Sequence, residues 1–395
     1  MATAGRDATP APTASDIAAA LADAGFVRLI ASDDGDAVAA TGLLARALST
    51  IGTPFQASVH APFDATTANT QDAYTVTVGG LDHPANAAVP DDVAASAMAF
   101  DVASELTAKS GTDEATMAQG EPNPTLALAG TIAADEVIPP VVEAAEAAGI
   151  DRRPGVSVPV TDLADGLARS TLFHAPFSGD GDAASAALET LDLAGRSAEN
   201  IEEGDWRRIA SLVALEASSS TAVAERSAEA VERGLHPYVG GPVETVGGFA
   251  DVLDATARDE PGVALSLALG HDGSREVAID AWRDHAAAAH AALADGETNR
   301  YDGLLVLRGP SMPVVTVARL AVDFRSPEPA ALAITDGEAA IRSRDGSDVA
   351  SALAAGAERV DGTAIGSEDG ARAHFDTEDW TATADDLAAG VREAL

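Results

Sequence analysis

Apolar and polar positions along the chain follow two different periods, which predict strands separated by helices. In the first 150 residues, short apolar runs bounded by polar or glycine-containing segments predict strands at 27–31, 55–59 and 74–78. Longer stretches with helical periodicity predict helices at 16–24, with Ser15 as N-cap, and at 38–48, 92–108, 124–133 and 138–148. Strands separated by helices of this length are typical of βαβ units and a parallel sheet.

The pattern changes after Gly149. Residues 151–204 are rich in turns and predict a connector with short helices, and a second α/β pattern follows. In this second part we predict helices at 206–217 and 279–293 and strands at 263–269, 303–307, 314–317, 331–335 and 339–342. The predicted architecture is two α/β lobes flanking a cleft, with a disordered N-terminus at 1–15, a first domain at 16–150, a connector at 151–204 and a second domain at 205–395.

The chain is strongly acidic. Sixty-three acidic residues against 24 basic ones leave a formal net charge of −39, and Lys109 is the only lysine. Such a surface is typical of a protein dissolved in molar salt, where ions screen the repulsion between carboxylates, and it predicts a halophilic host. The charge therefore reports the environment and leaves nucleic-acid binding open, although phosphate binding normally depends on basic side chains.

The sequence contains no cysteine, which excludes disulfides, thiolate catalysis and cysteine-ligated zinc or iron–sulfur centres. No apolar stretch reaches the ~20 residues needed to cross a bilayer. The first fifteen residues also lack the apolar core of a signal peptide. We predict a cytoplasmic protein without a membrane partner.

Candidate chemistry lies in the acidic turn that follows the first strand. Asp34 and Asp36 stand two residues apart between this strand and a helix, so that both carboxylates can point at one site. The N-terminus of the helix adds N–H groups that favour an anion. Hydrolysis of a phosphodiester needs two metal ions and several ligands, so two aspartates alone are too few. A solvated acidic loop is the alternative interpretation of the same residues.

The segment from Ser32 to Ala40 resembles the opening motif of the DHH phosphoesterase superfamily, His-x-Asp-x-Asp-Gly-x-x-Ser/Ala. The resemblance implies that Asp34 and Asp36 are metal ligands, although Ser32 replaces the histidine and Ala37 the glycine. An active member would present an aspartate after the third strand and then an Asp-His-His triplet. This chain continues with Gly79-Gly80-Leu81-Asp82-His83-Pro84, in which Asp82 and His83 are the remnant of the triplet and the remaining implied ligands.

Later segments resemble archaeal RecJ-like exonucleases and Cdc45-like proteins in the same order along the chain. They are residues 127–135, which include Asp135, residues 170–179, and residues 244–258, which end at Arg258. The resemblance implies that Arg258 binds nucleic acid or phosphate. A smaller second domain of the DHHA1 type is implied, with a Gly-Gly-His loop that binds phosphate. Gly366 and Ser367 stand near its place, with the histidine lost or displaced to His374, and Arg342 and Arg344 are placed to meet a nucleic-acid backbone.

The resemblance implies two classes of function. One is a non-catalytic, Cdc45-like protein of DNA replication and repair that holds single-stranded DNA or RNA, or joins GINS and the replicative helicase, and needs no metal. The other is an active single-strand exonuclease that uses Mn²⁺ or Mg²⁺ on Asp34, Asp36, Asp82 and His83. The incomplete ligand set favours the non-catalytic class.

Overall fold

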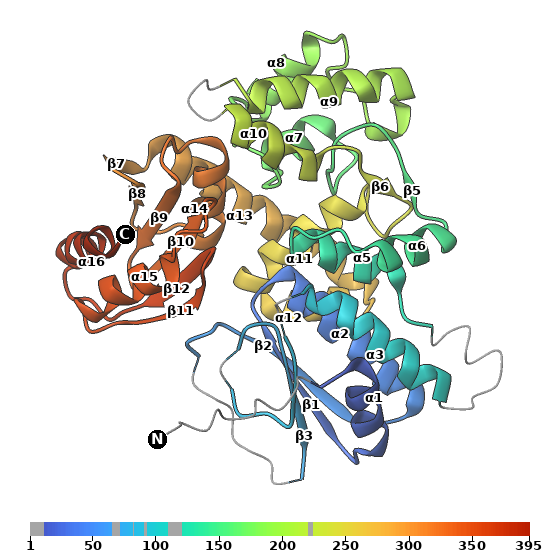
Figure 1. Ribbon diagram of the computed structural model, residues 1–395. Coiled ribbons are helices and arrows are strands. Elements are labelled where there is room, and N and C mark those ends of the chain that lie inside the picture. The colour runs from blue at the N-terminus through green and yellow to red at the C-terminus, as the bar shows by residue number, and fades with distance from the viewer. Residues whose placement is uncertain (1–11, 65–71, 82, 91–92, 110–120, 220–223) are drawn as a thin grey trace.

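The computed structural model describes residues 12–64, 72–81, 83–90, 93–109, 121–219 and 224–395. Two α/β lobes, each with its own sheet, are joined by a helical connector, as Figure 1 shows with the first lobe in blue and the last in orange and red. The predicted fold class is thereby confirmed.

The first lobe is built on a four-stranded parallel sheet. Its strands are β1 (Val27–Ser32), β2 (Phe55–His60), β3 (Tyr74–Val78) and β4 (Ala87–Val89), in the order β2-β1-β3-β4. All six residues of β1 are buried because this strand is paired on both sides and covered by helices. Its carboxyl end lies at the edge where parallel α/β sheets place their ligands, so the acidic turn is well positioned for a site.

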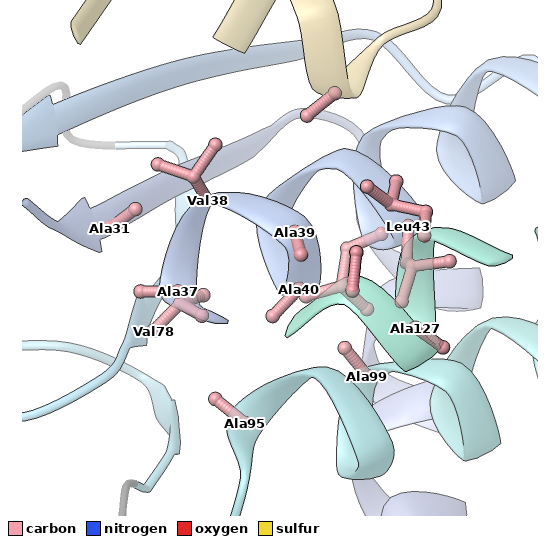
Figure 2. Close-up of a cluster of buried hydrophobic side chains, with 14 of the residues drawn as sticks. Ala31, Ala37, Val38, Ala39, Ala40, Leu43, Val78, Ala95, Ala99 and Ala127 are labelled. Atoms are coloured by element: carbon pink, nitrogen blue, oxygen red, sulfur yellow. The ribbon is translucent and has the colours of Figure 1, made fainter. Parts of the chain in front are cut away.

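Helices of the first lobe pack closely because their contact faces are lined with small side chains. They are α1 (Ala14–Asp23), α2 (Gly35–Ile51), α3 (Ala95–Lys109), α5 (Pro124–Ala133) and α6 (Pro139–Ala147). Figure 2 shows Ala39 and Ala40 of α2 in one buried cluster with Ala99 of α3 and Ala127 of α5. Alanine is the best helix former and adds little bulk, so α2 is buried on nearly every side.

Two helix starts differ from the sequence prediction because side chains cap them earlier. Thr13, and not Ser15, is the N-cap of α1, since its hydroxyl accepts the Asp16 N–H while the Asp16 carboxylate accepts the Thr13 N–H. Ser15 instead donates to Glu105. The second helix begins at Gly35 because Asp34 caps it.

The connector and the helices after it pack against both lobes. They comprise β5 (Asp151–Arg152), α7 (Leu163–Arg169), α8 (Gly181–Glu189), α9 (Glu203–Ala217), α10 (Ala224–Val231), β6 (Tyr238–Val239), α11 (Val246–Asp259), α12 (Pro261–Ala268) and α13 (Arg275–Asp295). Strand β5 pairs antiparallel with β6. Phe249 and Leu253 of α11 and Leu267 of α12 belong to the same buried core as the first sheet. The predicted domain boundaries remain a proposal.

The second lobe is built on a six-stranded mixed sheet. Its strands are β7 (Glu297–Tyr301), β8 (Leu304–Arg308), β9 (Ala330–Thr335), β10 (Glu338–Ser343), β11 (Thr363–Ser367) and β12 (Gly370–His374), in the order β11-β12-β10-β9-β8-β7. Only the β8–β9 pair is parallel within this sheet. Helix α14 (Val314–Phe324) covers one face, and α15 (Val349–Glu358) and α16 (Trp380–Ala394) cover the other.

Two strand predictions in this half were wrong. Residues 263–269 lie mostly in α12, which starts with Pro261 in its first turn, where proline is well tolerated. Residues 314–317 open α14, whose buried positions recur with a helical period at Val314, Val317, Ala318 and Ala321. Short β-branched runs do not distinguish a strand from a buried helix. No helix in the described ranges is long and apolar enough to cross a membrane.

Candidate functional site

The turn after β1, residues Ser32 to Asp36, is called the motif turn below. The side chain of Asp34, at the centre of this turn, forms hydrogen bonds with its sequence neighbours. One carboxylate oxygen accepts a hydrogen bond from the Ala37 N–H at 2.8 Å, and this bond caps α2. The other oxygen accepts a hydrogen bond from the hydroxyl of Ser32. Burial raises the pKa of Asp34, whereas these two hydrogen bonds oppose the rise. Ser32, which stands in place of the motif's histidine, is therefore a partner of Asp34.

Asp36 caps a second helix. Its two carboxylate oxygens accept the N–H groups of Ala95, at 2.6 Å, and Ser96, at 3.0 Å, in the first turn of α3. Burial raises the pKa of Asp36 to about 7, and the neighbouring charge of Asp34 contributes to the rise. This carboxylate therefore joins α2 to α3.

We predict that Asp36→Ala lowers the free energy of unfolding by about 1–3 kcal/mol, because two buried N–H groups lose their acceptor. Asp36→Asn should cost less, since the amide oxygen can still accept one bond. Denaturant unfolding in high salt measures both, with Asp348→Ala, which removes the exposed cap of α15, as the matched control. A loss for Asp36→Ala no greater than that for Asp348→Ala would contradict the assignment.

Two arginines from outside the first sheet reach the motif turn. Arg372 of β12 pairs with Asp33 at 2.5 Å and so joins the second lobe to the first. From α11, Asp254 accepts the Gly35 N–H at 3.1 Å and pairs with Arg258 at 2.6 Å. Burial opposes the charge of Arg258, but Asp254 and Asp33 hold the pKa of this guanidinium above its usual value. The carboxylates around the turn are thus neutralised by guanidinium groups.

The neighbouring strand end leaves no space for a further ligand. Gly79, directly after β3, has a φ of +83°, and a Cβ added there would stand 2.1 Å from the Ser32 hydroxyl oxygen. An aspartate at this position would therefore collide with the motif turn. Nδ1 of His83 lies 2.8 Å from the carbonyl oxygen of Pro84, and Nε2 of His83 is buried without a described partner. Asp82 lies outside the described residues.

The described residues do not fit a pair of divalent metal ions. Among them, no three His, Asp or Glu side chains come together in a way that could hold a metal. The oxygens of Asp34 and Asp36 already accept hydrogen bonds, and Asp33 and Asp254 are paired with arginines. Metal ligation by Asp34, Asp36, Asp82 and His83 remains a prediction.

A second group of charges lies where the two lobes and the connector meet. Asp323 of α14 accepts hydrogen bonds from Arg344 at 2.8 and 3.1 Å and also pairs with Arg233, which lies directly after α10. Asp135, at the end of α5, lies 3.5 Å from Arg233 and 3.7 Å from Arg344. These four residues line a cavity of about 630 Å³, called the interlobe cavity below.

Two further arginines in this region have no carboxylate partner among the described residues. Arg319 of α14 donates to the hydroxyl of Thr171 at 3.2 Å. Burial, together with the charge of Arg233, lowers the pKa of Arg319 to about 10. Burial also lowers the pKa of Arg342, with a further contribution from Arg344. The guanidinium of Arg342 lies over Gly370 of β12, where a Cβ would stand 2.6 Å from its Nη1.

The predicted phosphate loop is a tight hairpin between β11 and β12. Gly366 faces Ala371 so closely that a Cβ would stand 2.4 Å from the Ala371 Cα, and Ser367 pairs with Gly370. The exposed Glu368 and Asp369 form the tip of the hairpin. His374 at the other end of β12 stacks on Phe63 of the first lobe, with ring centroids 6.0 Å apart. Phosphate binding by Gly366 and Ser367 remains a prediction.

Comparison with known proteins places the chain in a family. A relative from Haloarcula marismortui, described as "Uncharacterized protein rrnAC1427", is 51% identical over 395 residues, and the match covers 100% of both chains. The chain belongs to the rrnAC1427 family. The model of this family's C-terminal domain matches residues 296–393, which correspond to the second lobe from β7 to α16.

Solved structures show that this rrnAC1427 family member has the RecJ/Cdc45-like fold. CDC45 from Entamoeba histolytica matches with a TM-score of 0.59 and 11% identity, over 96% of this chain and 98% of that one. Exonuclease RecJ bound to manganese matches with a TM-score of 0.51 and 14% identity, over 97% of this chain and 95% of that one. RecJ from Thermus thermophilus in complex with Mn²⁺ matches with a TM-score of 0.53 and 15% identity, over 98% of this chain and 55% of that one. The resemblance seen in the sequence is thereby confirmed for the fold.

Several site residues of this rrnAC1427 family member were missed by the sequence analysis. Arg258 was predicted to bind nucleic acid or phosphate, and that role remains a prediction. Its ion pair with Asp254 was not predicted, although the two residues stand four positions apart on one helix, where helical spacing indicates such a pair. Arg319, Asp323 and Arg372 carried no such signal, because their partners lie far away in the sequence.

Proposed function

We propose that this chain holds single-stranded nucleic acid between its two lobes without hydrolysing it, as a component of DNA replication or repair. Its fold is that of RecJ and Cdc45. The carboxylates of the motif turn cap helices or pair with arginines, which favours the non-catalytic of the two predicted classes.

The observation that carries the proposal is that neither Arg319 nor Arg342 forms a direct ion pair among the described residues, although burial lowers the pKa of both. An unpaired, desolvated cation is costly in a folded protein unless a partner supplies the opposite charge. Here Asp323 lies near enough to raise the pKa of both guanidiniums, but neither forms a direct ion pair with a described carboxylate, in a chain with 63 acidic residues. Phosphates of a nucleic-acid backbone can supply a direct partner, and binding them releases counterions.

We expect Arg342→Gln to weaken the binding of a fluorescent single-stranded oligonucleotide and to lower the slope of log K against log salt by about one. Fluorescence anisotropy across a series of potassium chloride concentrations measures both. Arg207→Gln, on the exposed face of α9, is the matched control and should bind as the native chain does. Equal affinity of the native chain and Arg342→Gln, or no binding at all, would contradict the proposal.

The same oligonucleotide, incubated with manganese and analysed on a denaturing gel, tests the active exonuclease. We expect its length to stay unchanged. Shortening that disappears in Asp34→Asn would show hydrolysis at the motif turn and overturn the non-catalytic function. Binding of DNA compared with RNA, and capture of GINS or a replicative helicase, test the finer partner predictions.

A further inference from the structure

A second cavity, of about 300 Å³, lies apart from the motif turn and shares no lining residue with the interlobe cavity. Its walls come from α2, the start of α5, the turn after β6 and the junction of α12 and α13. This volume is at the lower end of the range that small-molecule sites occupy. We call it the α12 cavity.

The lining of the α12 cavity is basic in an otherwise acidic protein. Arg46, His271 and Arg275 line it, and none of the described residues that line it is an aspartate or glutamate. The interlobe cavity, in contrast, is lined by five carboxylates, those of Asp135, Glu136, Glu229, Glu232 and Asp323. The absence of carboxylates among the described lining residues is therefore not a general property of this chain's cavities, and it favours an anion.

Arg46 of α2 is one of the basic residues that line this cavity. Its guanidinium lies against Gly270, where a Cβ would stand 3.4 Å from Nη1 and where the φ of +87° favours glycine. Glu121 lines an adjoining hollow beside Arg46 but forms no ion pair with it among the described contacts. The guanidinium thus keeps hydrogen-bond donors for a ligand.

Part of the lining of the α12 cavity is apolar. Leu126, Phe249 and Leu267 contribute this part, and all three are buried. Apolar and basic lining residues in one cavity match a ligand with an organic part and one charged end. We propose that the α12 cavity binds an organic phosphate the size of a mononucleotide, with its phosphate on Arg46 and its base against the apolar residues. This site goes beyond the proposed function, because it is separate from the cleft that would hold a nucleic-acid strand.

Isothermal titration of the full chain with deoxyadenosine monophosphate tests this site. We expect saturable binding, and at least about a tenfold loss of affinity for Arg46→Gln, since a charge-assisted hydrogen bond is lost. His271→Glu changes an exposed side chain, so it should fold normally and weaken binding by repulsion. Arg207→Gln, on the exposed face of α9, should bind the nucleotide as the native chain does.

Three results would overturn the proposal. They are the absence of binding to the native chain, an unchanged affinity in both Arg46→Gln and His271→Glu, and equally tight binding of deoxyadenosine or of inorganic phosphate. If the native chain binds deoxyadenosine monophosphate but no oligonucleotide, only the function proposed for the interlobe region is refuted. The two proposals can therefore fail separately.

Discussion

Replacing Arg258 by methionine is expected to lower the free energy of unfolding by about 3–5 kcal/mol, because the change leaves buried carboxylates without their counter-charge. Asp254 pairs directly with this arginine, and Asp33 and Asp34 also hold its pKa above the usual value. Methionine keeps most of the side-chain volume, so the loss would be electrostatic. Denaturant unfolding in high salt, followed by circular dichroism, measures it.

The double variant Arg258→Met with Asp254→Asn is the control for this prediction. Asparagine removes the unpaired charge but keeps an oxygen that can accept the Gly35 N–H, so most of the lost stability should return. Manganese should raise the melting temperature of Arg258→Met more than that of the native chain, because only the variant leaves these carboxylates uncompensated. A single variant as stable as the native chain would refute this role of Arg258.

Much of the first lobe could be predicted from local sequence. Its three longer strands and its helices were placed to within a few residues, since alternating apolar runs and caps are local signals. The motif turn was also located, because it follows the most buried strand of the first sheet. The errors at α12 and α14 arose where a short apolar run was read without the residues that continue its helical period.

The chemistry of the motif turn could not be predicted in the same way. Asp36 meets the start of α3 about 60 residues further along the chain, and Arg372 reaches Asp33 across 339 residues. Neither pairing can be predicted from sequence spacing, because both depend on how helices and lobes pack. The same aspartates therefore resemble metal ligands in the sequence and serve as helix caps and ion-pair partners in the folded chain.

Asp251 on α11 is the second site at which a single substitution should have a large effect. It is buried, and its carboxylate accepts the Thr171 N–H at 3.0 Å, the Thr171 hydroxyl at 2.5 Å and the Trp282 indole N–H at 2.9 Å. These bonds join α11 to the connector and to α13. Asp251→Ala would leave all three donors buried and unpaired, so we expect a loss of about 3 kcal/mol or more in the free energy of unfolding.

Asp251→Asn separates hydrogen bonding from charge at this position. The two N–H donors share one carboxylate oxygen, which the amide oxygen can replace. The other oxygen meets only the hydroxyl of Thr171, which can turn and accept from the new amide group. We therefore expect asparagine to cost about 1 kcal/mol or less, measured by the same unfolding experiment. If asparagine were as damaging as alanine, the carboxylate charge would be the essential feature. That charge would then act through its attraction to Arg319, whose pKa Asp251 helps to raise against burial.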